Sequence, residues 1–520
     1  MEFYNDFYLR GSLTDEQIHY LDKILKMEKI ESLKRIIPES AKLYGRECED
    51  IVLYDAQTLA VGMAYINPYF FIGDKPGLGK TIMSAAIYAH YKKKCFEEGK
   101  EPSKLLVITD NNHVQGISND YKRCGINLVP LYGGTDKINK AVEKFDLEDV
   151  EIDGVVTSWS SIRINGFLMF YQEEKEHFKF GIFDETSTLK NDKNQVFKQA
   201  DLIASNMERI VFLNASTFET SLLDIFNQFK VLNPTVMPVK KFLYERYIKQ
   251  GRRSWFETQY VNVEGSLTPK RVKKFAYMIT DYVNQEELRE RIKYHYIART
   301  KEDYSKDIPK NMFKLHPVKM TERMASMLGE SLHNYREILN SPSTLENGFE
   351  INTKTVPKLE VLIDLFESIM HERPVIYCFN TESQKAIKRE LEDKGYKIEI
   401  ISGQENQKLE DRQKILDDFK EGVYDGLIIN VEKAINIYGS DAMIFYDIPT
   451  NPQITYQIMG RIDRNNFKDA KSYHFLMYFD SPEMQNMIDL AYFREVHSGK
   501  FTGQYEDVYK QLIRQLEAYI

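Results

Sequence analysis

Short apolar runs alternate along this chain with longer stretches in which apolar positions recur every three or four residues, from about residue 51 onward. A short run that is apolar throughout predicts a strand buried on both faces, and the longer stretches predict amphipathic helices. In the first half, the predicted strands are 69–72, 105–109, 154–158, 180–183 and 210–213. Their alternation with helices predicts a parallel α/β sheet.

A second series of the same kind begins after about residue 350. Its predicted strands are 375–379, 398–401, 426–430, 443–446 and 473–478. Between the two series, residues 236–310 are mostly polar and basic, and residues 311–350 have a helical pattern. Helical patterns also mark both ends of the chain, and Thr14 and Gln17 have the spacing of a capping box.

The sequence therefore predicts two α/β lobes that flank a basic insertion. We expect a helical N-terminal region at 1–50, a first lobe at 51–235, the insertion at 236–310, a second lobe at 311–480 and C-terminal helices at 481–520.

Composition is that of an ordinary globular protein. The chain has 520 residues, which is too long for a single hydrophobic core. Its residues are 42% hydrophobic and 28% charged, a composition too apolar for a disordered chain. We find no run of eighteen uncharged apolar residues and no pattern of a secretory signal at the start. The four cysteines lie far apart, which argues against disulfides and zinc. We expect a cytoplasmic protein without a membrane partner.

Charge is unevenly distributed. The net charge is −8, yet residues 240–274 hold ten Lys and Arg against three Glu, a local charge of +7. A basic segment in an acidic protein predicts a phosphate-binding surface, and the alternative is a solvated helical face.

The sharpest motif follows the first predicted strand. Residues 73–81, GDKPGLGKT, join that strand to a predicted helix, with glycines at Gly77 and Gly79. Glycines let backbone N–H groups turn toward an anion, and the N-terminus of the helix adds a favourable dipole. Lys80 can reach the β- and γ-phosphates, and the Thr81 hydroxyl can bind Mg²⁺. The strict pattern has a glycine where this chain has Asp74. This loop predicts a nucleoside triphosphate site.

Two further features fit the chemistry of phosphoryl transfer. Asp184 and Glu185 follow the apolar strand at 180–183, so the first can hold Mg²⁺ and the second can polarise the attacking water. Arg461 and Arg464 lie three residues apart near the end of the second lobe, where guanidinium groups can stabilise the charge on the γ-phosphate. Two lobes that share a nucleotide also predict that hydrolysis opens and closes the cleft between them.

These residues resemble helicase superfamily 2, and within it the Swi/Snf-type DNA translocases. Residues 74–81 match that subgroup's Asp-x-x-Gly-x-Gly-Lys-Thr loop, so Asp74 is expected there. Residues 54–62 resemble the adenine-reading segment, and Leu-Lys-Asn at 189–191 is typical of Swi/Snf members. The usual Ala-His after the acids is Thr186-Ser187 here. Residues 296–310 are similar to the family's Leu-Arg-Arg-x-Lys segment.

The resemblance continues in the second lobe. Residues 374–379 and 401–403 are similar to motif four and the segment after it, and 447–464 are similar to the approach to motif six. Residues 429–437 resemble motif five, although Glu432, Lys433 and Ala434 replace its usual glycines.

The resemblance implies two RecA-like lobes, with ATP and Mg²⁺ in the cleft and DNA across the opposite face. It implies nucleotide contacts at Tyr54, Gln57, Gly77, Gly79, Lys80, Thr81 and Gln457, and Mg²⁺ ligands at Thr81 and Asp184. It implies DNA-side residues at the ends of strands, namely Thr109, Asn111, Thr157, Ser158, Thr381, Ser402, Asn430 and Asn436. The basic insertion would add Arg252, Arg253, Lys273 and Lys274.

We therefore predict an ATP-dependent DNA translocase or helicase that acts on duplex or branched DNA, in fork regression, branch migration, replication, recombination or repair. Two alternatives stay open: an RNA helicase, and a nucleotide switch or motor subunit of a nuclease or restriction-type complex. Partners would be DNA and a nuclease or a replication or recombination protein. The compact motor with altered motifs suggests a bacterial or phage-infected cytoplasm.

Overall fold

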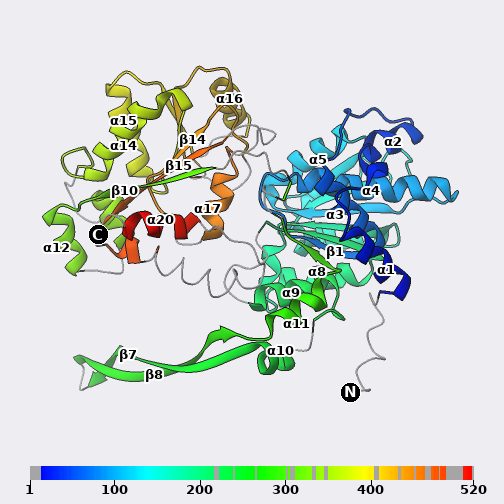
Figure 1. Ribbon diagram of the computed structural model, residues 1–520, viewed down its shortest axis with the longest axis horizontal. Coiled ribbons are helices and arrows are strands. Elements are labelled where there is room, and N and C mark those ends of the chain that lie inside the picture. Colours follow the sequence, from blue (N-terminus) through cyan, green and yellow to red (C-terminus); the bar gives the residue numbers. More distant parts are fainter. Residues whose placement is uncertain are drawn as a thin grey trace.

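The computed structural model places most of the chain in two lobes and one projecting arm (Figure 1). For residues 252–280 it describes the backbone alone. The residues that it describes are 13–215, 222–237, 240–263, 266–299, 303–304, 311–330, 335–344, 350–402, 409–430, 435–449, 452–462, 470–479, 481–485, 487 and 508–517. No helix within these ranges is long and apolar enough to cross a membrane.

The first lobe is built on a seven-stranded sheet in the order β3-β4-β2-β5-β6-β1-β9, whose neighbouring strands pair in parallel. Its strands are β1 (Tyr69–Ile72), β2 (Lys104–Thr109), β3 (Leu128–Leu131), β4 (Gly154–Ser158), β5 (Phe178–Asp184), β6 (Arg209–Leu213) and β9 (Tyr296–Ile297). Because the strands are parallel, their carboxyl ends meet at one edge of the sheet, where the candidate site lies.

Helices cover both faces of this sheet. They are α3 (Asp55–Ile66), α4 (Lys80–Glu97), α5 (Val114–Arg123), α6 (Thr135–Val142), α7 (Asn165–Glu174), α8 (Gln195–Ser205) and α9 (Leu222–Leu232). Side chains alternate between the faces, so Phe71 of β1 packs in one apolar cluster while Phe70 and Ile72 pack in the other. Burial on both faces is why these strands are apolar throughout.

The N-terminal helices α1 (Asp15–Ile24) and α2 (Ile36–Leu43) pack into the second of those clusters through Leu21, Ile36 and Ile37. The predicted capping box is present: the Gln17 amide N–H donates to the Thr14 hydroxyl over 3.2 Å. In this structure the N-terminal helices are therefore part of the first lobe's core.

The second lobe is built on a six-stranded parallel sheet in the order β10-β15-β14-β11-β13-β12. Its strands are β10 (Met312–Val318), β11 (Val375–Tyr377), β12 (Ile398–Ile401), β13 (Gly426–Ile429), β14 (Ala442–Phe445) and β15 (Ser472–Tyr478). The flanking helices are α12 (Glu322–Glu330), α13 (Tyr335–Asn340), α14 (Pro357–Ile369), α15 (Thr381–Asp393), α16 (Leu409–Lys420), α17 (Pro452–Met459) and α20 (Val508–Glu517). Two parallel sheets with flanking helices confirm the predicted α/β class.

The helical expectation for residues 311–350 was wrong at its beginning, because β10 is a strand. Pro317 within it and Pro130 within β3 weaken a strand pattern in a sequence. Both strands lie at an edge of their sheets, where a residue without an N–H group is tolerated.

The basic insertion forms a long antiparallel hairpin of β7 (Ile248–Val263) and β8 (Ser266–Tyr282), held between α10 (Lys240–Tyr247) and α11 (Gln285–Ile292). Figure 1 shows it as an arm that projects from these two helices. The base of the arm is anchored in the first lobe, because Tyr247 and Tyr282 are buried in that core and the Tyr247 hydroxyl donates to Glu287 over 2.7 Å.

Candidate active site

The phosphate loop runs from the end of β1 to the start of α4, as the sequence predicts. Gly77 and Gly79 have φ values of 83° and 76°, in the left-handed region that favours glycine. A Cβ on Gly79 would lie 2.6 Å from Gln57 Nε2, so a side chain here would displace the Gln57 amide. Gly79 directly precedes α4, so the loop leads into the N-terminus of a helix, where backbone N–H groups can bind a phosphate.

Lys80, the first residue of α4, folds back over this loop. Its Nζ donates to the carbonyl oxygen of Asp74 over 2.7 Å and to that of Lys75 over 3.3 Å. A triphosphate in the loop would compete with these neutral carbonyls, and the bond from the ammonium to a phosphate oxygen is the stronger one because both partners are charged. Thr81 follows in the first turn of α4.

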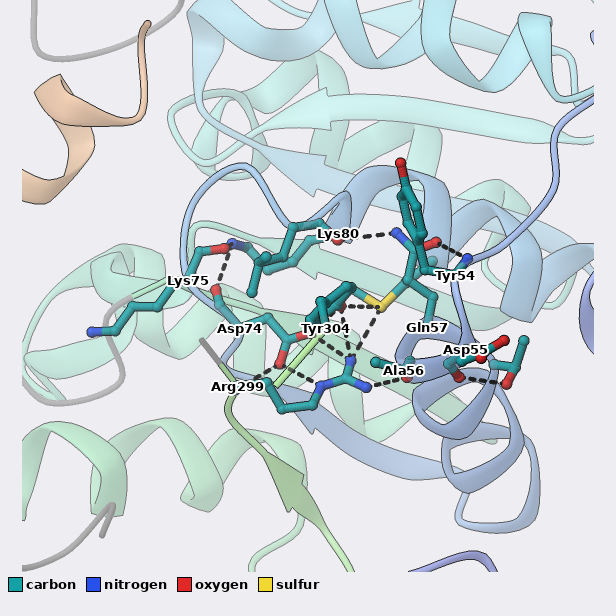
Figure 2. A network of polar contacts seen from close by, with 12 residues as sticks. Tyr54, Asp55, Ala56, Gln57, Asp74, Lys75, Lys80, Arg299 and Tyr304 are labelled. Carbon is teal, nitrogen blue, oxygen red and sulfur yellow. Dashed lines mark hydrogen bonds and ion pairs between the residues drawn. The ribbon is translucent and has the colours of Figure 1, made fainter. Parts of the chain in front are cut away.

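The predicted base-reading segment lies beside the loop. The Oε1 of buried Gln57 accepts from the Tyr54 amide over 2.9 Å, and its Nε2 donates to the Leu78 carbonyl over 3.0 Å. Tyr54 is 44% exposed, and its ring meets the ring of Tyr304 edge to face, with centroids 6.4 Å apart. Tyr54 and Gln57 are thus next to the phosphate loop, with an aromatic surface at its rim (Figure 2).

The acid pair comes from the end of β5. Asp184 Oδ2 accepts from the Thr109 hydroxyl over 2.9 Å, and the Asp184 carbonyl accepts from Trp159 Nε1 over 2.8 Å. Burial and the neighbouring Glu185 carboxylate raise the pKa of Asp184 well above its usual range, while the Lys80 charge opposes the shift. Glu185 itself turns out of the strand with a φ of 50°. Lys80 of the phosphate loop is thus close enough to Asp184 for its charge to act on that carboxylate.

These residues fit a magnesium ion. A carboxylate whose charge is disfavoured by burial and by a second acid is stabilised by a divalent cation, and Mg²⁺ prefers oxygen ligands such as those of Asp184 and Thr81.

The second lobe meets the first at the phosphate loop. A Cβ on Gly460 would lie 2.8 Å from Pro76 Cβ, and Lys75 Nζ lies 5.0 Å from the centre of the Tyr456 ring. The end of α17 therefore touches the loop that is predicted to hold the triphosphate.

Arg461 is the next residue in the chain after Gly460, which makes that contact. It is buried, and its guanidinium donates to the Ile435 carbonyl over 3.2 Å. Gln457 lies in α17 and is half-buried. Arg464, the other predicted arginine, lies outside the described residues.

Sequence comparison agrees with this architecture. Residues 69–376 match the model of the SNF2-related domain, which is more than half of the chain. The chain belongs to the SNF2-related family. Residues 357–466 of this SNF2-related chain also match the helicase conserved C-terminal domain. It is thus an ATP-hydrolysing enzyme of the helicase type, within the superfamily that the motifs resemble.

The SNF2-related chain is similar to several proteins of known structure. One is a Sulfolobus solfataricus SWI2/SNF2 ATPase core in complex with dsDNA, 16% identical, with 89% of this chain and 96% of that chain covered and a TM-score of 0.38. Another is a variant of S. cerevisiae Dbp5 bound to RNA and ADP BeF3, 12% identical, with 95% and 99% covered and a TM-score of 0.51. The latter likeness shows the fold, so the two sheets are tandem RecA-like lobes.

A curated relative matches over a shorter region. Eukaryotic initiation factor 4A of Cryptosporidium parvum is 26% identical over 109 residues, which are 21% of this chain and 26% of that protein. The match spans about a quarter of the relative's length.

The predicted DNA-side residues of the first lobe differ in exposure. Asn111 is exposed, whereas Thr109, Thr157 and Ser158 are fully buried. Thr109 binds Asp184, and the Ser158 hydroxyl bonds to that of Ser161 over 2.8 Å. These three side chains are thus internal, and contact with a nucleic acid there would fall to backbone groups.

In the second lobe, two of the predicted DNA-side residues lie together. Asn430 Nδ2 donates to the hydroxyl of buried Ser402 over 3.0 Å, whereas Asn436 is exposed and Thr381 begins α15. Arg252, Arg253, Lys273 and Lys274 lie on the arm, where the backbone alone is described. All of these contacts stay predictions.

A buried polar cluster occupies the place of the usual Ala-His segment. The Thr186 hydroxyl donates to Gln228 Oε1 over 2.7 Å, and Asn214 Nδ2 donates to the same oxygen over 3.1 Å. In the SNF2-related chain, this cluster joins the segment after the acid pair to the end of β6.

Sequence reasoning missed three functional neighbours: Thr109 as the partner of Asp184, Trp159 beside it, and Arg299, which binds Asp74. One signal was present in the sequence. That signal is the aspartate inside the phosphate loop, because a buried carboxylate needs a cationic or hydrogen-bonding partner. In the structure Asp74 is fully buried.

Proposed function

We propose that this SNF2-related enzyme is an ATP-driven motor that translocates on DNA and acts on duplex or branched substrates. The observation that carries the proposal is the contact between Gly460 and Pro76, which brings the second lobe to the phosphate loop. A site completed from two lobes can convert hydrolysis into relative movement of those lobes.

Each site residue has a separate role in this proposal. Lys80 leaves the loop carbonyls and binds the β- and γ-phosphates, while Tyr54 and Gln57 receive the adenine. Glu185 orients the attacking water and accepts its proton, and Arg461 moves from the Ile435 carbonyl to the γ-phosphate as the lobes close. Bound Mg²⁺, held by Thr81 and Asp184, would neutralise part of the charge on the phosphates.

The arm supports DNA as the substrate. Each strand is about 50 Å long at roughly 3.3 Å per residue, and a two-stranded ribbon fits the major groove of duplex DNA. The register puts Trp255 opposite Lys274 and Phe256 opposite Lys273, so basic and aromatic residues are paired along it. Basic residues suit phosphates and aromatic residues suit unpaired bases, as at a fork or junction.

Two other functions fit parts of the site. An RNA helicase is favoured by the likeness to an RNA-bound structure of the same fold. A motor subunit of a nuclease complex is favoured by the altered glycines at 432–434. We favour a DNA motor that works in replication, recombination or repair in a bacterial or phage-infected cell, because of the basic arm and the Leu-Lys-Asn segment at 189–191.

The steady-state rate of ATP hydrolysis with different nucleic acids tests the proposal. We expect strong stimulation by forked or four-way DNA, weaker stimulation by plain duplex and little by RNA. Greater stimulation by RNA would favour the helicase alternative, and a rate unchanged by any nucleic acid would favour the subunit alternative.

Neutralising the arm should weaken DNA binding in a salt-dependent way. We expect the combined Arg252→Ala, Arg253→Ala, Lys273→Ala and Lys274→Ala variant to flatten the plot of log Kd against log salt by about 0.9 per lost phosphate contact. As a matched control, alanine at Lys94, Lys100, Lys385 and Lys394, each paired with a glutamate on the body, should leave the slope unchanged. Equal slopes for both variants would show that the arm is a solvated surface.

A further inference from the structure

Asp74 is the carboxylate at the centre of a buried network in the phosphate loop (Figure 2). Its Oδ1 accepts from Arg299 Nε over 3.1 Å and from the Arg299 backbone amide over 3.0 Å. Its Oδ2 accepts from the Arg299 guanidinium over 2.5 Å. Asp74 is fully buried and Arg299 is 8% exposed, so this is a two-point ion pair shielded from solvent.

Tyr304 closes the network from the next described segment. Its hydroxyl donates to Asp74 Oδ2 over 2.8 Å and accepts from the Arg299 guanidinium over 3.1 Å. Burial and the nearby Asp74 raise the pKa of Tyr304, so the hydroxyl keeps the proton that it donates. The same ring meets Tyr54 at the rim of the nucleotide site.

Arg299 and Tyr304 belong to the stretch that connects the lobes. β9 runs beside β1, and the backbone contacts continue past the strand: Gly73 N donates to the Ile297 carbonyl over 2.6 Å, and Lys75 N donates to the Arg299 carbonyl over 3.0 Å. After Tyr304 the chain continues to β10, the first strand of the second lobe. The connection is therefore bound to the phosphate loop before it enters the second lobe.

The backbone carbonyl of Asp74 faces Lys80, whereas its carboxylate faces the connection. Lys80 Nζ donates to the Asp74 carbonyl oxygen, while the Asp74 carboxylate holds Arg299 and Tyr304. When ATP draws Lys80 away, the bond to this carbonyl is broken, and a shift of Asp74 would act on both connection residues.

We propose that Asp74, Arg299 and Tyr304 form a junction that transmits occupation of the phosphate loop to the connection between the lobes. Arg299 and Tyr304 are positioning residues, since they act on the loop through Asp74. The inference rests on Lys80 as the lysine that binds ATP, and it is independent of which nucleic acid the enzyme uses.

Tyr304→Phe tests the junction, because it removes one hydroxyl and keeps the ring beside Tyr54. We expect kcat without nucleic acid to fall about tenfold, as for loss of one hydrogen bond to a charged group, with the Kd for ATP changed less than about twofold. Tyr294→Phe is the matched control, because it removes a hydroxyl that donates to Asp22 over 2.8 Å, away from the loop, and it should behave as the unmodified chain.

Lobe closure gives a second readout. A donor and an acceptor fluorophore can be placed on Leu202→Cys and Val423→Cys, which are exposed positions on the two lobes, after replacement of the half-buried Cys48 by serine. We expect ATP to change the energy transfer in this chain, and Tyr304→Phe to reduce that change several-fold. Arg299→Lys should reduce the ATP-dependent change as well, because an ammonium cannot make the two-point contact with Asp74.

The outcomes separate the junction from other roles. A lower melting temperature with unchanged kcat and closure in Tyr304→Phe would overturn the proposal in favour of a structural role, and a raised Kd alone would make Tyr304 a nucleotide contact. If Lys80→Ala bound and hydrolysed ATP normally, the site assignment itself would fail. Loss of stimulation by DNA, with closure intact, would affect the proposed function and leave the junction standing.

Discussion

Lys80→Ala will abolish ATP hydrolysis while leaving DNA binding largely intact. The ammonium group lies on the phosphate loop and contacts its Asp74 and Lys75 carbonyls, whereas the basic arm is a separate part of the molecule. Loss of the group that binds the transferred phosphate removes positioning and charge stabilisation together, so turnover should fall by at least about a thousandfold. Release of phosphate and DNA binding, measured on the same preparation, check the two halves of this expectation.

Lys94→Ala is the matched control for Lys80→Ala. Lys94 lies on the same helix and pairs with Glu97 on the surface, so its loss should leave hydrolysis within about twofold of the unmodified rate. Undiminished turnover in Lys80→Ala would rule out this loop as the triphosphate site.

Arg461→Ala will lower kcat by about 10³- to 10⁵-fold, with ATP affinity nearly unchanged. A guanidinium inserted in the transition state stabilises charge that is absent from the ground state, so its loss appears in kcat rather than in binding. Arg461 directly follows the residue that touches the phosphate loop, which places it close enough to turn toward a bound triphosphate. Single-turnover hydrolysis and equilibrium binding of a slowly hydrolysed ATP analogue separate the two quantities.

Because Arg461 is buried and donates to Ile435, its loss could also loosen the second lobe. Thermal melting of the variant therefore accompanies the kinetics, and Arg389→Ala, at a partly exposed arginine on α15, provides a control for charge removal in that lobe. A raised KM with unchanged kcat would mean that Arg461 binds the nucleotide equally in the ground state and the transition state.

Local patterns in the sequence were sufficient for the strands and the loop of the site. The strand at 69–72 and the glycines of the loop were predicted where the structure has them, and a helix was predicted after the loop, although α4 begins at Lys80, earlier than its apolar pattern indicates. The acids at the end of β5 were likewise predictable, because an apolar run followed by two carboxylates is a signal within one short segment. Each of these features is determined by residues that lie close together in the sequence.

Features that depend on distant residues were missed. Asp74 and Arg299 are 225 residues apart, and no periodicity relates them. Thr109 resembled a surface residue at a strand end, yet the fold turns its hydroxyl to Asp184. The edge strands β3 and β10 contain proline, which hides their pattern until the sheet order is known.

A structure of the enzyme with ADP and beryllium fluoride tests the central claim most directly, because the fluoride takes the place of the γ-phosphate. We predict that Lys80 and Arg461 both lie within hydrogen-bond distance of the fluoride, about 2.7–3.2 Å, with Arg461 released from the Ile435 carbonyl. An Arg461 guanidinium that still binds Ile435, in lobes closed on the nucleotide, would contradict a site completed by the second lobe.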